Sequence, residues 1–311
     1  MRHALGYILS LSLCLAPAAC SKKEDKKEEA KPDESDKDKK SKKKDDGEDG
    51  IAFKVKAPAI GDRTEEKKKH DLNVSIEIDV GPKPQSAEIT EVETVVEKTE
   101  VLAVDGKAVT KAKITYVEFS KKETEGGKPK IKPKSPLDGN TYILALDDGK
   151  VVATDGKGGK LAKAEEEALL KKHRNFGKPD PILAGMPEKR IKVGDKVDKL
   201  ADALREHFKK DDDGKSPLEV TDITVKLASI DKDGDDEVGV FAVELTLGSP
   251  KDTKELFSMK MTMKGKIRVR TKDAFATSID LKGPLTISGT DPKIKVTGKG
   301  DAHMQATTTK E

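Results

Sequence analysis

The sequence predicts an α+β domain that is mainly β and follows a leader and a disordered charged tether. Three observations lead to this fold class. Apolar and polar residues alternate over many short segments, turn residues separate neighbouring segments, and only the middle of the chain has helical spacing. We therefore expect one or more curved antiparallel sheets, with roughly ten or more strands in all, packed on two central helices.

The start of the chain has the pattern of a secretory leader. Arg2 and His3 precede an apolar run over residues 4–15, and small residues over 16–19 lead to Cys20. A positive start, a short apolar centre and small residues at the cleavage site are typical of a signal peptide. The segment resembles bacterial lipoprotein precursors, which are cleaved before an acylated cysteine.

This resemblance implies that residues 1–19 are removed and that Cys20 is the lipid-attachment site. Pro17 departs from the pattern, because Leu is usual there. By analogy, Ser21 after the cysteine favours the outer membrane, so we expect an exported protein anchored to a bacterial membrane, with the lipid bilayer as its partner. The alternative is ordinary cleavage after Ala18, which would release a soluble protein with a free thiol. Cys14 leaves with the leader in either case.

Residues 20–50 form the expected linker. Nearly every residue after Cys20 is Lys, Asp or Glu, and no apolar period offsets the entropy of ordering the segment. The lysines of 42–44 are followed at once by acidic residues, which cancel most of the attraction to anionic lipid. We expect a spacer that holds residues 51–311, the envelope domain, away from the lipid surface.

The first β block covers residues 51–155. Strict alternation over 72–80 predicts a strand with one buried face. Two further strands, over 88–104 and 108–119, are separated by Asp105-Gly106, which is a hairpin signal. A second hairpin joins 142–146 to 151–154.

The helical middle covers residues 156–215. Residues 160–175 have helical spacing and stop near Gly177. Asp195 can cap a second helix, whose apolar face carries Val197, Leu200, Leu204 and Phe208.

The second β block covers residues 216–311. Leu218 and Val220 differ in phase from the apolar residues of 223–227, which predicts a bulge near Asp222. Alternation then predicts strands over 241–247, 257–269 and 275–281, a turn at Gly283-Pro284, and strands at 285–287 and 294–306.

One candidate site is an apolar ligand face. Met259, Met261 and Met263 share a face with Phe257, and we expect Leu200, Leu204 and Phe208 of the second helix to face them. Methionine adapts to irregular apolar shapes, which suits a pliable lipid pocket. Alternating thioethers also suit copper(I), but neither His nor Cys lies nearby in the sequence. Plain core packing is the third interpretation.

Other patterns favour neither a metal nor catalysis. Asp231, Asp233 and Asp235 lack the glycine and glutamate positions of a calcium loop, and residues 156–160 lack the spacing of a phosphate loop. No nucleophile motif is present in the mature chain. We expect no cofactor and no enzymatic activity. Lys and Arg number 61 against 58 Asp and Glu, with 3% aromatic residues, so nucleic acid is not an expected partner.

Met186-Pro187, residues 193–195 and the hairpin over 142–155 resemble an uncharacterised family of bacterial cell-envelope lipoproteins. The resemblance spans roughly residues 54–307. Lys196 and Val197 stand where that family often has tryptophan. The resemblance to this family implies no activity. A looser similarity, on architecture alone, is to lipoprotein-carrier half-barrels, whose curved sheet holds acyl chains.

The leading functional hypothesis is a non-enzymatic envelope lipoprotein that binds an apolar ligand or an envelope protein. The alternative is a structural or assembly lipoprotein with a filled core and no ligand. The two hypotheses differ in whether a pocket lies between the sheet and the helix that carries Leu200 and Leu204.

Overall fold

The computed structural model describes residues 50–79, 85–130, 134–208, 218–249, 257–289 and 295–311. The predicted signal peptide, Cys20 and the charged linker up to residue 49 lie outside the described residues. Within them the chain forms the following elements: β1 Arg63–Asp79, β2 Gln85–Asp105, β3 Ala108–Glu125, β4 Lys128–Lys130, β5 Thr141–Asp147, β6 Lys150–Asp155, α2 Lys163–Lys172, α3 Pro181–Gly185, α4 Asp198–His207, β7 Glu219–Asp233, β8 Asp236–Gly248, β9 Phe257–Arg270, β10 Ala276–Gly289 and β11 Lys295–Lys310.

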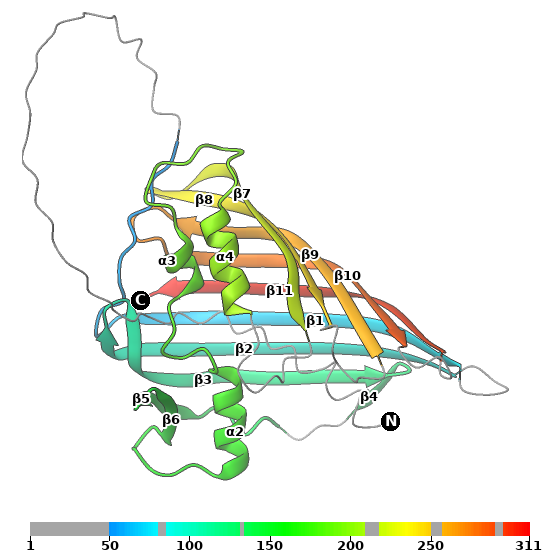
Figure 1. Ribbon diagram of the computed structural model, residues 1–311. Coiled ribbons are helices and arrows are strands. Elements are labelled where there is room, and N and C mark those ends of the chain that lie inside the picture. Colours follow the sequence, from blue (N-terminus) through cyan, green and yellow to red (C-terminus); the bar gives the residue numbers. More distant parts are fainter. Residues whose placement is uncertain (1–49, 80–84, 131–133, 209–217, 250–256, 290–294) are drawn as a thin grey trace, which may run out of the picture.

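All eleven strands belong to one curved antiparallel sheet, so the mainly β prediction is confirmed. The order is β6-β5-β3-β2-β1-β11-β10-β9-β8-β7, with β4 paired to β3. Within each block, strands that follow one another in the sequence pair as a meander, with β4 beside β3 as the exception. The first and last strands, β1 and β11, lie side by side in the middle and join the two meanders (Figure 1).

β1 is longer than the alternation predicted. It begins at Arg63, nine residues before Leu72, and runs through a charged segment that has no apolar period. Glu66 is nevertheless buried on the same face as Val74 and Ile76. The sheet therefore has a polar region on its concave face, and it is this region that the hydrophobic pattern missed.

The helices lie on one face of the sheet, as Figure 1 shows. α2 and α4 fall within the two segments with helical spacing, and α3 was not predicted. α3 begins after Asp180, whose carboxylate accepts hydrogen bonds from the amides of Ile182 and Leu183, and Pro181 occupies its first turn. This carboxylate explains why so short a helix starts where it does.

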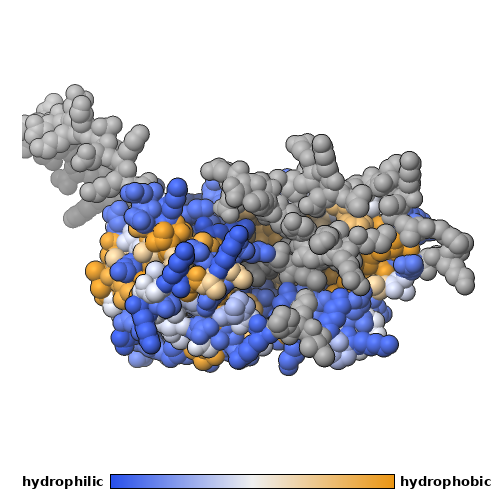
Figure 2. Space-filling view, turned by 90° about the horizontal axis from the view of Figure 1, so that it is seen from below, coloured by the Kyte–Doolittle hydropathy of each residue, from blue (hydrophilic) through white to orange (hydrophobic). Residues whose placement is uncertain are grey.

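Two hydrophobic clusters form the core. The larger one joins α3 and α4 to β7–β11 and to the apolar half of β1. The smaller one joins α2 to β2, β3 and β5. Seen from below, much of the visible surface is hydrophilic, with hydrophobic side chains gathered at the left end and again toward the right end (Figure 2).

Strand irregularities account for part of the curvature. The predicted bulge near Asp222 is present, because the register of β7 against β8 shifts between Val220 and Asp222. The predicted turn at Gly283-Pro284 was wrong. β10 continues through both residues and keeps its pairing with β11, while the pairing with β9 is interrupted there.

The pairing of β10 with β9 is interrupted at a diagonal line of glycines, which brings neighbouring strands unusually close. Gly265, Gly283 and Gly300 lie on adjacent strands β9, β10 and β11. A Cβ atom would stand 1.8 Å from the nearest backbone oxygen at Gly265, 1.9 Å at Gly283 and 2.0 Å at Gly300. Only glycine allows such an approach, and a bend in the sheet follows from it.

Candidate functional site

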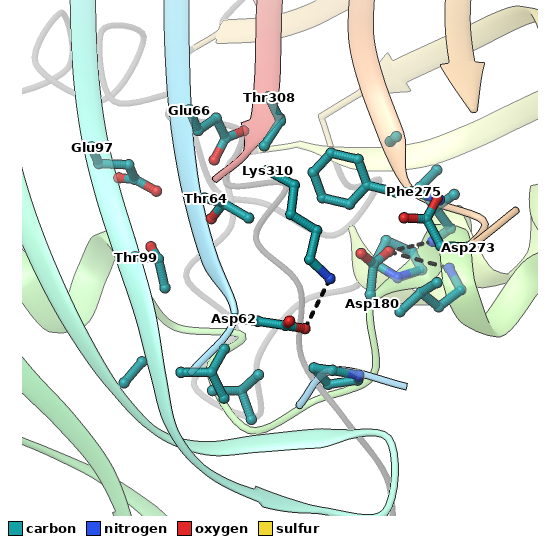
Figure 3. Close-up of a pocket in the computed structure, with 18 of the residues that line it drawn as sticks. Asp62, Thr64, Glu66, Glu97, Thr99, Asp180, Asp273, Phe275, Thr308 and Lys310 are labelled. Carbon is teal, nitrogen blue, oxygen red and sulfur yellow. Dashed lines mark hydrogen bonds and ion pairs between the residues drawn. The ribbon is translucent and has the colours of Figure 1, made fainter. Parts of the chain in front are cut away.

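A cavity of about 140 Å³ lies on the concave face of the sheet, beside α3 (Figure 3). It is bounded by the start of β1, the ends of β2 and β11, the starts of β3 and β10, and the segment that connects α2 to α3. Its walls are mainly apolar and include Val101, Ile114, Ile182, Phe275 and Ile279. An engineered apolar cavity of about this size, roughly 150 Å³, holds a benzene molecule.

Asp62 and Lys310 form an ion pair at the cavity, with 3.0 Å between Oδ2 and Nζ (Figure 3). They come from the residue before β1 and from the end of β11. Burial alone would raise the pKa of Asp62, but the Ala59 amide and Lys310 outweigh it and lower that pKa. The pair therefore joins the two central strands at the cavity.

Glu66 and Glu97 face the same cavity from β1 and β2. They are direct cross-strand partners, and their exposed fractions are only 8% and 5%. Both carboxylates share one cation: Lys68 Nζ is 2.7 Å from Glu66 and 3.2 Å from Glu97. One lysine thus serves two buried acids.

The two carboxyl groups have pKa values displaced in opposite directions. Burial raises the pKa of Glu66 to about 7, and the negative charge of Glu97 adds to this. Burial also opposes ionisation of Glu97, but Lys68 and His173 outweigh it and lower the pKa of Glu97 to about 2. Below pH 7 the pair therefore holds one proton, mainly on Glu66, and it loses this proton as the pH rises through about 7.

His173 follows α2 and lines the cavity next to this pair. Its Nε2 is 2.7 Å from the hydroxyl oxygen of Tyr116 on β3. Burial lowers the pKa of His173 to about 4, so its ring is neutral at neutral pH. Asp180, which caps α3, also lines the cavity, and burial raises its pKa to about 6 even though it accepts two amide hydrogen bonds.

Glu97 is the last of three buried glutamates along β2. Glu91 and Glu93 are buried on the same face, where Lys121 of β3 lies 2.5 Å from Glu91 and Lys172 of α2 lies 2.9 Å from Glu93. The signal in the sequence is that residues 91, 93 and 97 are in phase with buried Ile89 and Val95. Acids in the buried phase of a strand indicate a polar interior site.

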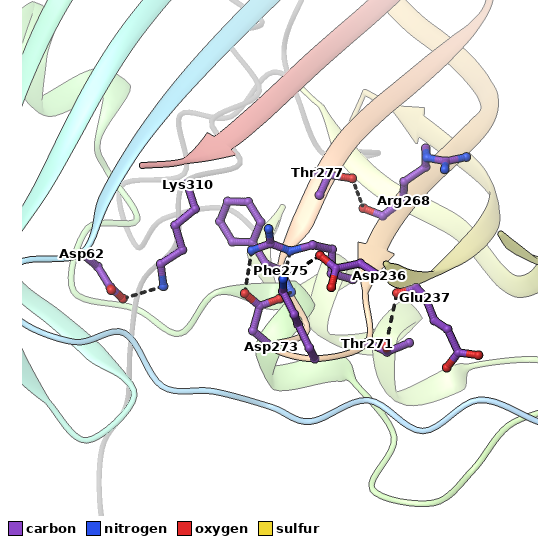
Figure 4. A network of polar contacts seen from close by, with 11 residues as sticks. Asp62, Asp236, Glu237, Arg268, Thr271, Asp273, Phe275, Thr277 and Lys310 are labelled. Carbon is purple, nitrogen blue, oxygen red and sulfur yellow. Dashed lines mark hydrogen bonds and ion pairs between the residues drawn. The ribbon is translucent and has the colours of Figure 1, made fainter. Parts of the chain in front are cut away.

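A polar network holds the β9–β10 turn, which carries Phe275 to the cavity (Figure 4). Arg270 pairs with Asp273 at 2.6 Å, and its guanidinium carbon lies 4.9 Å from the centre of the Phe275 ring. Lys272 and Thr271 connect the turn to Asp236 and Glu237 of β8. These contacts therefore fix the position of Phe275 in the cavity wall.

The predicted ligand face lies elsewhere. All seven residues belong to the larger hydrophobic cluster, where Met261, Met263, Leu200, Leu204 and Phe208 are buried and Phe257 and Met259 are partly buried. They are brought together, yet the lining of the cavity is made of other residues. Their role in ligand binding stays a prediction.

The described residues contain no group of three His, Cys, Asp or Glu side chains placed to hold a metal ion. Within the same residues, each helix is too short or too polar to cross a bilayer.

No family model and no curated protein sequence matches the chain. Among solved structures, the chain is similar to a DUF1329 family protein from Desulfovibrio piger, with 6% sequence identity and a TM-score of 0.13. The match covers 75% of this chain and 83% of that one. It is a weak structural neighbour.

Proposed function

We propose that this protein is a non-enzymatic envelope lipoprotein that binds a small apolar ligand in the cavity beside α3. The observation that carries the proposal is a cavity with mainly apolar walls and a few polar groups that converge on it from several elements, which is the usual composition of a ligand site. The polar groups are held by ion pairs and hydrogen bonds from several strands, so the site is formed before any ligand arrives.

The anchor in this proposal is Cys20, on the strength of the leader pattern alone. Acylation of this cysteine would hold the domain near a membrane, where apolar ligands are concentrated. An exported protein whose intact mass lacks diacylglycerol would remove the anchor from the proposal and leave the binding site untouched.

A structural role is the second candidate, and one observation favours it. The face predicted to hold ligand is closely packed: Leu200 is 0% exposed, Met263 1% and Met261 4%. In this alternative the cavity beside α3 is a packing defect, and the sheet presents its outer surface to an envelope protein.

A binding measurement separates the two candidates. The purified full chain is titrated with 1-hexanol by calorimetry, and we expect one molecule to bind per chain. Ala276→Leu places an isobutyl group at the cavity wall and should weaken binding at least tenfold. Ala52→Leu is the matched control, because Ala52 is exposed and lies outside the cavity lining. A chain that takes up no hexanol would favour the structural role.

A further inference from the structure

Carboxyl groups outnumber cations around the cavity. Five acids line it, against two lysines: Asp62, Glu66, Glu97, Asp180 and Asp273 against Lys56 and Lys310. Two of these acids already have a cation at short range, since Lys310 is 3.0 Å from Asp62 and Arg270 is 2.6 Å from Asp273. Those two pairs leave no local surplus of charge.

The other three acids have a single ion-pair partner among the described residues. Lys68 serves both Glu66 and Glu97. Asp180 accepts hydrogen bonds from two amides at the start of α3, and no ion pair to it forms within the described part of the chain. The remaining cation at the cavity, Lys56, is exposed, so the cavity combines apolar walls with a surplus of buried or half-buried acidic groups.

Such a surplus discriminates between ligand head groups. A ligand carboxylate would add a negative charge beside Glu97 and Asp180 at low dielectric, whereas an ammonium group would donate a short charge-assisted hydrogen bond to a carboxylate and offset its charge. Building on the proposed function, we infer that the cavity selects an amphiphile with a primary amine on a small apolar body.

Amine binding is linked to the loss of a proton. Glu66 pairs with Lys68 on its own strand and faces Glu97 on β2, while Thr308 is its partner on β11. The other charged and titratable groups that line the cavity are Lys56, Asp62, His173, Asp180, Asp273 and Lys310. Burial raises the pKa of Glu66 to about 7. When a protonated amine binds near neutral pH, Glu66 releases its proton to the buffer and the carboxylate pairs with the ammonium group.

The test compares three probes of equal chain length on the purified full chain: hexylamine, 1-hexanol and hexanoate. At pH 8 we expect hexylamine to bind at least tenfold more tightly than hexanol, and hexanoate to bind most weakly. At pH 6 the preference for the amine should shrink several-fold. Calorimetry in two buffers of different ionisation enthalpy should show proton release on amine binding near pH 7.

Glu66→Gln should reduce the ratio of amine to alcohol affinity to near one. Glu65→Gln is the matched control, because Glu65 is the adjacent residue on the other face of β1 and lies outside the cavity lining; it should keep the wild-type ratio. Asp180→Asn, which retains an acceptor oxygen for the α3 amides, is a second variant and should lower the ratio as well.

The outcomes are distinguishable. If hexanol binds as tightly as hexylamine, or hexanoate binds more tightly, the inference is overturned while the proposed function stands. If none of the three probes binds, the proposed function fails and the inference fails with it. Proton release by the wild-type chain tests the inference even if a variant does not fold.

Discussion

Glu66 and Glu97 face each other across β1 and β2, at positions where an amphipathic strand usually carries apolar side chains. Removing two carboxylates from water is strongly unfavourable, and one lysine compensates for one of them. The second carboxyl group avoids the penalty by keeping its proton, which is why burial raises the pKa of Glu66 to about 7. A chain that only needed a stable sheet would do as well with two apolar residues here.

Stability should therefore depend on pH through Glu66. Its pKa rises from 4.5 to about 7 on folding, so between these pH values the unfolded chain loses the proton while the folded chain keeps it. Raising the pH across this window favours the unfolded state. Glu66→Gln removes this loss, so its stability relative to wild type should improve by about 3 kcal/mol between pH 4.5 and pH 7.

Urea unfolding of both proteins at several pH values measures this difference. Burial lowers the pKa of His70 and of His173 to about 4, which removes stability as the pH falls below about 6.5. Both proteins share that loss, so the comparison largely cancels it. A difference in stability that stays constant with pH would show that Glu66 ionises normally in the folded chain.

At the scale of elements, Lys172 connects α2 to the sheet. Its Nζ is 2.9 Å from buried Glu93 and 4.4 Å from the centre of the Phe119 ring. Lys172→Met leaves Glu93 without this partner in a buried position, and we expect the free energy of unfolding to fall by about 3–5 kcal/mol. Lys171→Met changes an exposed neighbour and should alter stability by less than about 0.5 kcal/mol.

The double variant Lys172→Met with Glu93→Gln shows whether the loss of stability comes from the negative charge of Glu93. It should recover much of the stability, because the remaining amide is neutral. Equal losses for the single and double variants would mean that Lys172 acts by packing alone. Urea unfolding of the wild type, Lys172→Met, Lys171→Met and the double variant measures these differences.

Elements with a local signal could be predicted from the sequence. Asp105-Gly106 marks the β2–β3 hairpin because two-residue turns need these residue types, and the bulge near Asp222 follows from a change of phase. The charged half of β1 could not be predicted, since Glu66 and Lys68 become buried through the neighbouring strands β2 and β11, which are distant in the sequence. The cavity has no local signal, because its lining comes from several strands and α3.

At the scale of the whole molecule, β11 joins two meanders that are separate in the sequence. It pairs with β1 on one side and β10 on the other, and it contributes Val296, Met304 and Ala306 to the larger cluster. Pairing β1 with β11 joins residues more than two hundred positions apart, and closing so long a loop costs conformational entropy that slows folding. The fold is therefore complete only once the C-terminal strand has docked.

A chain that ends at Gly289 lacks this strand and tests the dependence of one meander on the other. We expect β1 and β10 to expose unpaired edges, so the truncated chain should lose cooperative urea unfolding and aggregate. Removing Glu311 alone is the control. That residue makes a half-exposed ion pair with Lys98 at 2.8 Å, which contributes little to stability, and the shortened chain should unfold like wild type. A chain ending at Gly289 that kept a sharp transition and protease-resistant strands would instead show that each meander folds as an independent unit.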